Sequence, residues 1–300
     1  MEFESSVFTP LLCLVLANEA NSSFFFSFVK VPARFGLLDS SPARWFTLTT
    51  KLRELNASAG AGAAYKLIFF GRHGQGYHNM AEDKYGTEAW NDYWGMLYGD
   101  GGAHLGPCVI SSHNSAFWLL RRLTVITADP ELSGIGKAQA ADANETWKAE
   151  RAAGIPLPER LYCSPMTRAM QTNVITFDGV SDTCVVVLEN CREEYGWHTC
   201  NKRNTRTYIR TAFPKFEIED GFTEKDELWE VETQETKTRA AARARTVLDR
   251  IFRDDKDVLF VSITTHGGII HGFLHAMGRP IYQLPTGGVL PVVVKATNSV

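Results

Sequence analysis

The sequence predicts an α/β protein, a three-layer α/β/α sandwich built around a mixed, mainly parallel sheet. Hydrophobic segments of strand length alternate along the chain with segments of helical periodicity, which is the usual order of parallel strands joined by crossover helices. The first strand segment, residues 65–71, is apolar or glycine at six of its seven positions. Such a run is typical of a strand that helices cover on both faces.

The bulk composition is that of an ordinary globular protein. The 300 residues are 44% hydrophobic and 22% charged, which is enough for one large core. A net charge of −3 gives no global attraction to nucleic acid or to an anionic membrane. The longest early apolar run, residues 11–17, is too short to cross a membrane. We therefore expect a cytoplasmic protein that binds neither nucleic acid nor membrane.

The first 60 residues are expected to extend or wrap the main body, which we place at residues 61–300. Apolar side chains recur at helical spacing over residues 42–55, so this segment predicts a short amphipathic helix. Residues 56–64 are mostly small, as in a linker that leads into the first strand.

The next elements are a helix, an irregular region and a second helix. An aromatic segment over residues 87–98 predicts a helix that belongs to the core or to a lid. Residues 99–128 show no clean periodicity. Ser133 then caps a predicted helix over residues 134–153.

Two further strands and a helix follow. Residues 160–163 form a short strand segment, and Pro165 opens the helix after it, as proline does at a first turn. Residues 183–189 are rich in β-branched side chains and predict another strand.

The last third of the chain predicts a long helix and two strands. Thr223 is the expected cap of an amphipathic helix over residues 224–253. Residues 257–264 form a buried strand, which a second helix follows. The final strand spans residues 288–296, and Pro291 within it favours a position at the edge of the sheet.

Charged and polar side chains follow four of the predicted strands at the point where each strand ends. The carboxyl ends of parallel strands meet at one edge of a sheet, and open α/β sheets bind ligands there. The groups expected at this edge are two arginines, two histidines and one or two carboxylates: Arg72, His73, Arg168, Glu193, Glu194 and His266.

This set of side chains favours a phosphate pocket that needs no metal. Two guanidinium groups in one cleft repel each other unless an anion lies between them, and their fork geometry suits phosphate oxygens. Glycines beside the histidines, such as Gly267, allow the backbone to approach the anion closely. A neutral imidazole can attack phosphorus, and a carboxylic acid can then protonate the departing oxygen.

The motifs resemble those of the histidine phosphatase superfamily, in its phosphoglycerate-mutase-like branch. The matching segments are RHG at 72–74, SPMTRAMQT at 164–172, CREEYG at 191–196 and THGG at 265–268. The resemblance is closer to fungal and plant phosphoglycerate-mutase-like phosphatases, because RHGQGYHN at 72–79, WNDYW at 90–94 and the run at 191–203 also match. It covers roughly residues 28–296.

The resemblance implies a role for each matched residue. His73 is the nucleophile that becomes phosphorylated, and Glu193 matches the family's acid. The implied phosphate pocket contains Arg72, Arg168 and His266, with Gln75 and Asn79 at lesser positions.

Two features depart from the family pattern. The carboxylate of Glu193 lies three residues before Gly196, where many mutases have a spacing of four, so Glu194 is a rival for the acid. Residues 104–127 have no counterpart in the usual pattern. They are either an insertion in the domain or a retained intron in the gene model.

The expected function is metal-independent hydrolysis of a small phosphate ester through a phosphohistidine, with no cofactor. The substrate could be a sugar phosphate, a phosphoglycerate or a prenyl phosphate or diphosphate. One alternative is phosphoryl transfer of the mutase type, and another is a non-catalytic module that binds a phosphorylated ligand.

The remaining histidines are expected to be structural: His78, His198, His271 and His275. Cys191, His198 and Cys200 lie close together in the sequence, but no CxxC accompanies them, so a zinc site is not predicted. The six cysteines are scattered over a long chain, which favours reduced thiols.

Overall fold

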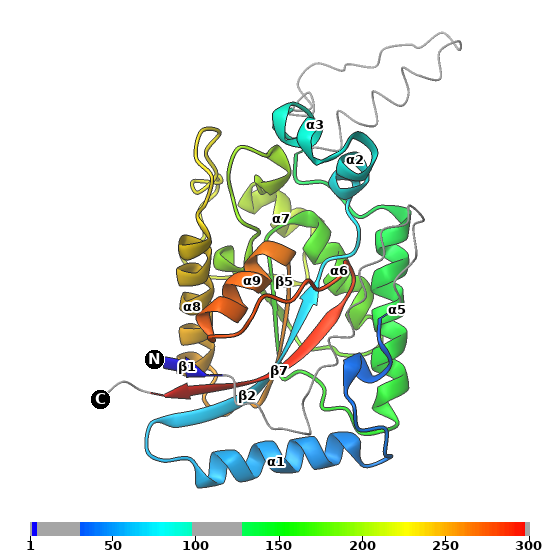
Figure 1. The fold of residues 1–300 in the computed structure, drawn as a ribbon, viewed down its shortest axis with the longest axis vertical. Helices are drawn as coiled ribbons and strands as arrows, with labels where there is room; N and C mark the ends of the chain where they lie inside the picture. Colours follow the sequence, from blue (N-terminus) through cyan, green and yellow to red (C-terminus); the bar gives the residue numbers. More distant parts are fainter. Residues whose placement is uncertain (1, 5–30, 98–127, 298–300) are drawn as a thin grey trace.

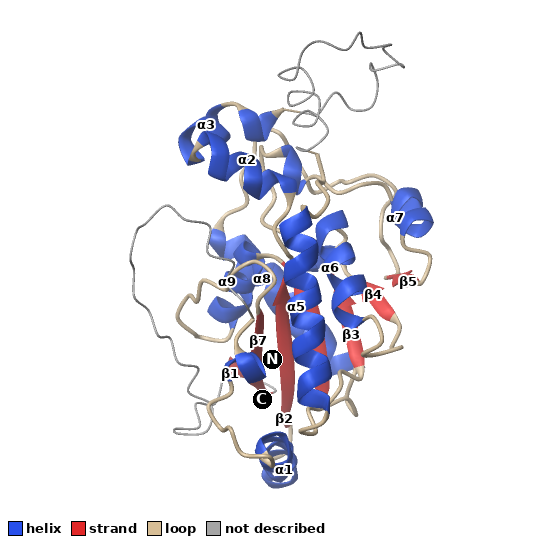
Figure 2. Ribbon diagram, turned by 90° about the vertical axis from the view of Figure 1, so that its right-hand side faces the viewer, coloured by secondary structure: helices blue, strands red, loops and turns tan. Residues whose placement is uncertain are grey.

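The computed structural model describes residues 2–4, 31–97 and 128–297 (Figures 1 and 2). Within them, one seven-stranded sheet has the order β1-β7-β2-β6-β3-β4-β5. Neighbouring strands are parallel from β2 to β5, whereas β7 is antiparallel to both β2 and β1. The strands are β1 (Glu2–Glu4), β2 (Ala63–Arg72), β3 (Arg160–Cys163), β4 (Val185–Val187), β5 (Phe216–Ile218), β6 (Phe260–Thr265) and β7 (Val289–Thr297). The predicted mixed, mainly parallel sheet is confirmed.

Helices cover both faces of this sheet, which confirms the predicted three layers. One face carries α8 (Lys237–Asp254) and α9 (Gly267–Ala276), and the other carries α1 (Arg44–Ser58), α5 (Gly134–Arg151) and α6 (Thr167–Phe177) (Figure 2). The shorter helices are η1 (Ala33–Gly36), α2 (Tyr77–Tyr85), α3 (Thr87–Asp92), η2 (Trp94–Met96), η3 (Glu189–Cys191), η4 (Thr199–Asn201) and α7 (Arg206–Ala212). Figure 1 shows α2 and α3 beyond the carboxyl end of β2.

Strand β2 explains why the sheet has a core on each side. Its side chains alternate between faces, so Leu67 and Phe69 belong to the cluster under α1, α5 and α6. Ile68 and Phe70 belong to the cluster under α8 and α9. All four side chains are fully buried, as the uninterrupted apolar run predicts.

Helix α1 packs onto the sheet through the side chains whose spacing predicted it. Trp45, Leu48 and Leu52 are buried in the same cluster as Phe69. The indole nitrogen of Trp45 also donates a hydrogen bond to Glu150 of α5, over 2.7 Å. The part of the first 60 residues that the structure describes therefore contributes directly to the core.

The position of β7 corrects the prediction made from Pro291. The strand lies second from the edge rather than at it, because β1 pairs with its last residues. Pro291 itself faces Phe69 of β2, whereas β1 pairs only with residues 295–297. The missing N–H of proline therefore falls on a stretch where β1 does not reach.

Helix α8 begins much later than predicted, so the proposed cap at Thr223 is wrong. The helix starts at Lys237, and the Thr236 hydroxyl accepts a hydrogen bond from the backbone N–H of Arg239. No helix begins after Thr223 because Asp226, three residues later, forms an ion pair with the buried side chain of Arg192. A buried charge pair outweighs a local capping preference.

Smaller differences concern helix ends and the irregular region. The helix predicted over 87–98 breaks at Tyr93, where the backbone leaves helical geometry before η2. Helix α6 starts at Thr167, two residues after Pro165. The insertion predicted at 104–127 lies outside the described residues. None of the described helices is long and apolar enough to cross a membrane.

Candidate active site

Hydrogen bonds at the carboxyl edge of the sheet bring the predicted strand ends together. Arg72 at the end of β2 pairs in register with Thr265 at the end of β6. The next residue, His73, donates its backbone N–H to the carbonyl of Thr265 over 2.9 Å. On the other side of β6, Ser164 donates to the carbonyl of Thr264 over 3.0 Å. The ends of β2, β3 and β6 therefore lie at the same level of the sheet, and they carry Arg72, His73, Ser164 and His266.

His73 is buried, and its hydrogen bonds determine which ring nitrogen carries the proton. Nδ1 lies 2.7 Å from the carbonyl oxygen of Gly74. A carbonyl can only accept, so Nδ1 carries the proton and Nε2 carries the lone pair. Burial lowers the pKa of His73 well below 6.5, and the positive charges of Arg168 and Arg72 lower it further. The ring is consequently neutral at pH 7, with Nε2 available as a nucleophile.

The turn after His73 requires glycine because it presses against the start of α5. A Cβ atom on Gly74 would lie only 2.2 Å from the carbonyl oxygen of Gly136. A Cβ on Gly136 would lie 2.1 Å from the carbonyl oxygen of Gln75. Only residues without side chains permit this approach, which places His73 against a rigid helix end.

His266 lies beside His73, with 4.9 Å between the ring centroids. It is the N-cap of α9, and its Nε2 lies 2.7 Å from the hydroxyl oxygen of Ser164. The other ring nitrogen, Nδ1, is buried and has no partner. Burial lowers the pKa of His266 well below 6.5, with a further contribution from Arg168.

Two guanidinium groups, from the buried Arg168 and the half-buried Arg72, complete the positive side of the site. Arg168 lies in the first turn of α6, and its Nε is 3.4 Å from Nε2 of His73. It also donates to the carbonyl of Cys200 over 2.7 Å and to the side-chain oxygen of Asn201 over 3.3 Å. Arg72 donates to the carbonyl of Leu284 over 2.7 Å, and its Nε is buried without a partner. This orphaned donor is the kind of group that an anion would satisfy.

Glu193 presents its carboxylate to the N-terminus of α9. Its two oxygens accept from the backbone N–H groups of Gly268 over 3.2 Å and Ile269 over 3.0 Å. Burial lowers the pKa of Arg72, and the nearby Glu193 carboxylate opposes that effect. Glu194 instead pairs with Lys237 over 2.5 Å. Of the two rival carboxylates, Glu193 is therefore the one beside Arg72.

Comparison with known proteins identifies the family. The family described as Histidine phosphatase superfamily (branch 1) matches residues 110–291, more than half of the chain. A probable phosphoglycerate mutase of Arthroderma benhamiae is 38% identical over 260 residues, covering 85% of this chain and 71% of the relative. This chain belongs to the histidine phosphatase superfamily.

Two further relatives support the assignment. A probable phosphoglycerate mutase of Saccharomyces cerevisiae is 31% identical over 77% of this chain and 79% of its own length. Phosphomutase-like protein 3 of Candida albicans is 33% identical over 78% of this chain and 66% of its own length. Among solved structures, a mycobacterial glucosyl-3-phosphoglycerate phosphatase aligns with 76% of this chain and 90% of its own, at 17% identity and a TM-score of 0.42.

His78 lies close to His73, although the sequence analysis expected it to have only a structural role. Its ring centroid lies 5.6 Å from that of His73. It is buried, its Nδ1 has no partner, and burial and Arg168 lower its pKa well below 6.5. The only available signal was its place in the motif at 72–79, which does not reveal the direction of its ring.

The implied lesser pocket residues make bonds within the protein. The side-chain oxygen of Gln75 accepts from the hydroxyl of Ser133 over 2.8 Å. The side-chain oxygen of Asn79 accepts from the backbone N–H of Gly76 over 3.0 Å. A phosphate-binding role for Gln75 and Asn79 therefore stays a prediction. In Gly267, a Cβ would lie 3.3 Å from the Arg72 guanidinium carbon.

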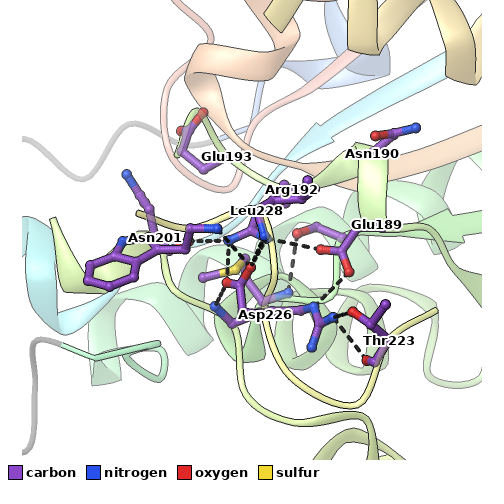
Figure 3. Close-up of polar contacts among 12 residues, drawn as sticks. Glu189, Asn190, Arg192, Glu193, Asn201, Thr223, Asp226 and Leu228 are labelled. Carbon is purple, nitrogen blue, oxygen red and sulfur yellow. Dashed lines mark hydrogen bonds and ion pairs between the residues drawn. The ribbon is translucent and has the colours of Figure 1, made fainter. Parts of the chain in front are cut away.

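A buried network behind the histidine phosphatase site joins two of its loops (Figure 3). Arg192 makes two hydrogen bonds of 2.6 Å to the carboxylate of Asp226 and one of 3.1 Å to Glu189. It also donates to the backbone carbonyl of Asn201 over 2.6 Å. The Asn201 side chain in turn accepts from Arg168. The residue next to Glu193 is thereby linked to the arginine beside His73.

Asp129 is another residue that the sequence analysis missed. Its buried carboxylate accepts from the backbone N–H and the hydroxyl of Thr167, over 2.9 and 2.8 Å. These two bonds fix Thr167 at the start of α6 and so help to orient Arg168, the next residue.

Within residues 2–4, 31–97 and 128–297, no three His, Cys, Asp or Glu side chains are grouped so that they could hold a metal ion.

Proposed function

We propose that this protein is a phosphomonoesterase that works without a metal, through a phosphohistidine formed on His73. The observation that supports it most directly is the state of His73. Its proton is on Nδ1, its pKa is low, and its unprotonated Nε2 accepts a hydrogen bond of 3.4 Å from Nε of Arg168. A neutral imidazole next to fixed guanidiniums suits attack on a phosphate ester.

In the first step, Nε2 of His73 attacks phosphorus, and the bond from phosphorus to the ester oxygen breaks. Arg72, Arg168 and His266 stabilise the charge on the three equatorial oxygens. Glu193, in its acid form, gives its proton to the departing oxygen. The products of this step are an alcohol and phosphohistidine.

In the second step, the Glu193 carboxylate accepts a proton from water, and the resulting hydroxide attacks phosphorus. The bond between phosphorus and nitrogen breaks, which releases inorganic phosphate and restores the neutral ring of His73. Glu193 is an acid again and ready for the next substrate.

The names of the relatives favour one alternative. The Arthroderma benhamiae and Saccharomyces cerevisiae proteins are both called probable phosphoglycerate mutases. A mutase would use the same pocket but return the phosphoryl group to the bound alcohol instead of to water. Release of inorganic phosphate supports hydrolysis, whereas formation of an isomer supports a mutase.

The test is a screen of sugar phosphates, phosphoglycerates and prenyl phosphates in the presence of EDTA. Wild-type protein is expected to release phosphate, and His73→Ala should lower the rate by about 10³-fold or more. Labelled phosphate should be trapped on the wild type after a quench that avoids acid, but not on His73→Ala. A wild type that binds phosphate yet neither hydrolyses nor isomerises any of these esters would identify a non-catalytic binding module.

A further inference from the structure

Arg243 of α8 holds the backbone of the loop that ends in Glu193. Its guanidinium donates to three carbonyl oxygens of that loop: Asn190 over 2.8 Å, Arg192 over 2.8 Å and Glu193 over 3.2 Å. The side chain is buried. One planar group thus bonds three carbonyls of a single turn, a geometry that fixes the path of the backbone.

Glu235 keeps Arg243 in this orientation. Its two carboxylate oxygens accept from Nε over 2.9 Å and from Nη2 over 2.6 Å. Glu235 is itself only 3% exposed. The fork of Arg243 is therefore fully engaged inside the protein and does not reach the reacting atoms.

The side-chain carboxylate of Glu193 is held by α9, the helix that packs against α8. The Glu193 carboxylate bonds to backbone N–H groups in the first turn of α9. Helices α8 and α9 pack so closely that a Cβ on Gly272 of α9 would lie 3.0 Å from the carbonyl oxygen of Ala240 of α8. The backbone of Glu193 is thus held by α8 and its carboxylate by α9, and these two helices pack tightly against each other.

We propose that Arg243 is a positioning residue for leaving-group protonation: it places the Glu193 carboxyl against the ester oxygen. This inference rests on the proposed function, in which Glu193 is the acid. Because Arg243 is proposed to act through Glu193, its loss should lower kcat/KM, which covers the steps up to loss of the alcohol, mainly for esters whose departing oxygen needs a proton.

The test compares two esters by kcat/KM, which covers the steps up to loss of the alcohol. An alkyl phosphate releases a basic alkoxide and needs the proton, whereas p-nitrophenyl phosphate releases a stable phenolate. Arg243→Lys keeps the charge opposite Glu235 but cannot span three carbonyls. We expect its kcat/KM to fall roughly 10- to 100-fold for the alkyl ester and less than about 3-fold for p-nitrophenyl phosphate.

A double-mutant cycle provides the second readout. In a Glu193→Gln background, Arg243→Lys should cause no further loss of kcat/KM for the alkyl ester, because residues that act through each other are not additive. If Arg243→Lys does not fold, Glu235→Gln, which releases one anchor of the guanidinium, should show the same dependence on the leaving group.

Arg44→Lys is the matched control. Arg44 is also a largely buried arginine paired with a glutamate, Glu150, over 2.7 Å, but it lies on α1. It should leave the rates for both esters unchanged.

Equal losses for the two esters, or a further loss in the Glu193→Gln background, would overturn the positioning role. A wild type that hydrolyses neither ester would instead refute the proposed function.

Discussion

At the scale of single residues, the site depends on keeping imidazoles neutral among positive charges. His73, His78 and His266 are all buried, and burial lowers the pKa of each well below 6.5, with a further contribution from Arg168. A protonated His73 would lose its nucleophilic lone pair. The two arginines proposed to bind the phosphate therefore also favour the neutral form of His73.

These three histidines should make stability depend on pH. In the unfolded chain each takes up a proton near pH 6.5, whereas in the native state it does not. The free energy of unfolding should therefore fall as the pH decreases below about 6.5, by up to about 1.4 kcal/mol per pH unit for each histidine. Urea titrations at about pH 7.5 and about pH 5.5 measure this.

His78→Gln is the informative variant for that experiment. It removes one of the three buried histidines, so its free energy of unfolding should depend less steeply on pH than that of the wild type. Identical pH dependence in the two proteins would show that His78 titrates normally in the native state.

At the scale of elements, His73 is positioned by contact between a strand-end loop and the start of a helix. The loop after β2 touches the first turn of α5 through Gly74 and Gly136. Helix α6 is held at its start by Asp129, and His266 is the N-cap residue of α9. His73, Arg168 and His266 therefore each lie where a loop meets the start of a helix.

Gly74→Ala tests this contact. The new Cβ would clash with the carbonyl of Gly136, and either the loop or α5 must shift. We expect a loss of about 1–3 kcal/mol in the free energy of unfolding and a fall of at least about 10-fold in kcat/KM, because His73 moves.

Gly134→Ala is the control, since no atom lies within 4 Å of its added Cβ. Its stability should change by less than about 0.5 kcal/mol. A Gly74→Ala protein as active as Gly134→Ala would contradict the proposed constraint.

At the scale of the whole molecule, the described residues just before β2 are part of the core. Helix α1 joins α5 and α6 on one face of the sheet, opposite α8 and α9. The sequence analysis placed a boundary near residue 60, and this boundary stays a prediction. The packing of Trp45 against the sheet favours a single cooperative unit.

Two neighbouring side chains of α1 measure that contribution. Trp45 is fully buried, whereas Phe46 is 70% exposed. Trp45→Ala should lower the free energy of unfolding by about 3–5 kcal/mol, and Phe46→Ala by less than about 0.5 kcal/mol. Chemical denaturation of both variants gives the comparison. Equal, small effects would mean that α1 is a dispensable extension.

Local patterns in the sequence determined the strand segments, several helix starts and the edge of the sheet where the chemistry lies. Hydrophobic runs and the cap at Ser133 depend on neighbouring residues, so they can be recognised without the fold. The same holds for Arg72, His73 and His266, because each lies at the carboxyl end of a strand.

Only the tertiary structure decided the features that depend on distant residues. Asp226 pairs with Arg192 instead of starting a helix, and β1 joins β7 from the opposite end of the chain. The proximity of His78 to His73, and the choice of Glu193 over Glu194 beside Arg72, depend on side-chain directions. Burial of charge and long-range pairing outweigh local preference at these positions, and neither can be evaluated before the chain is folded.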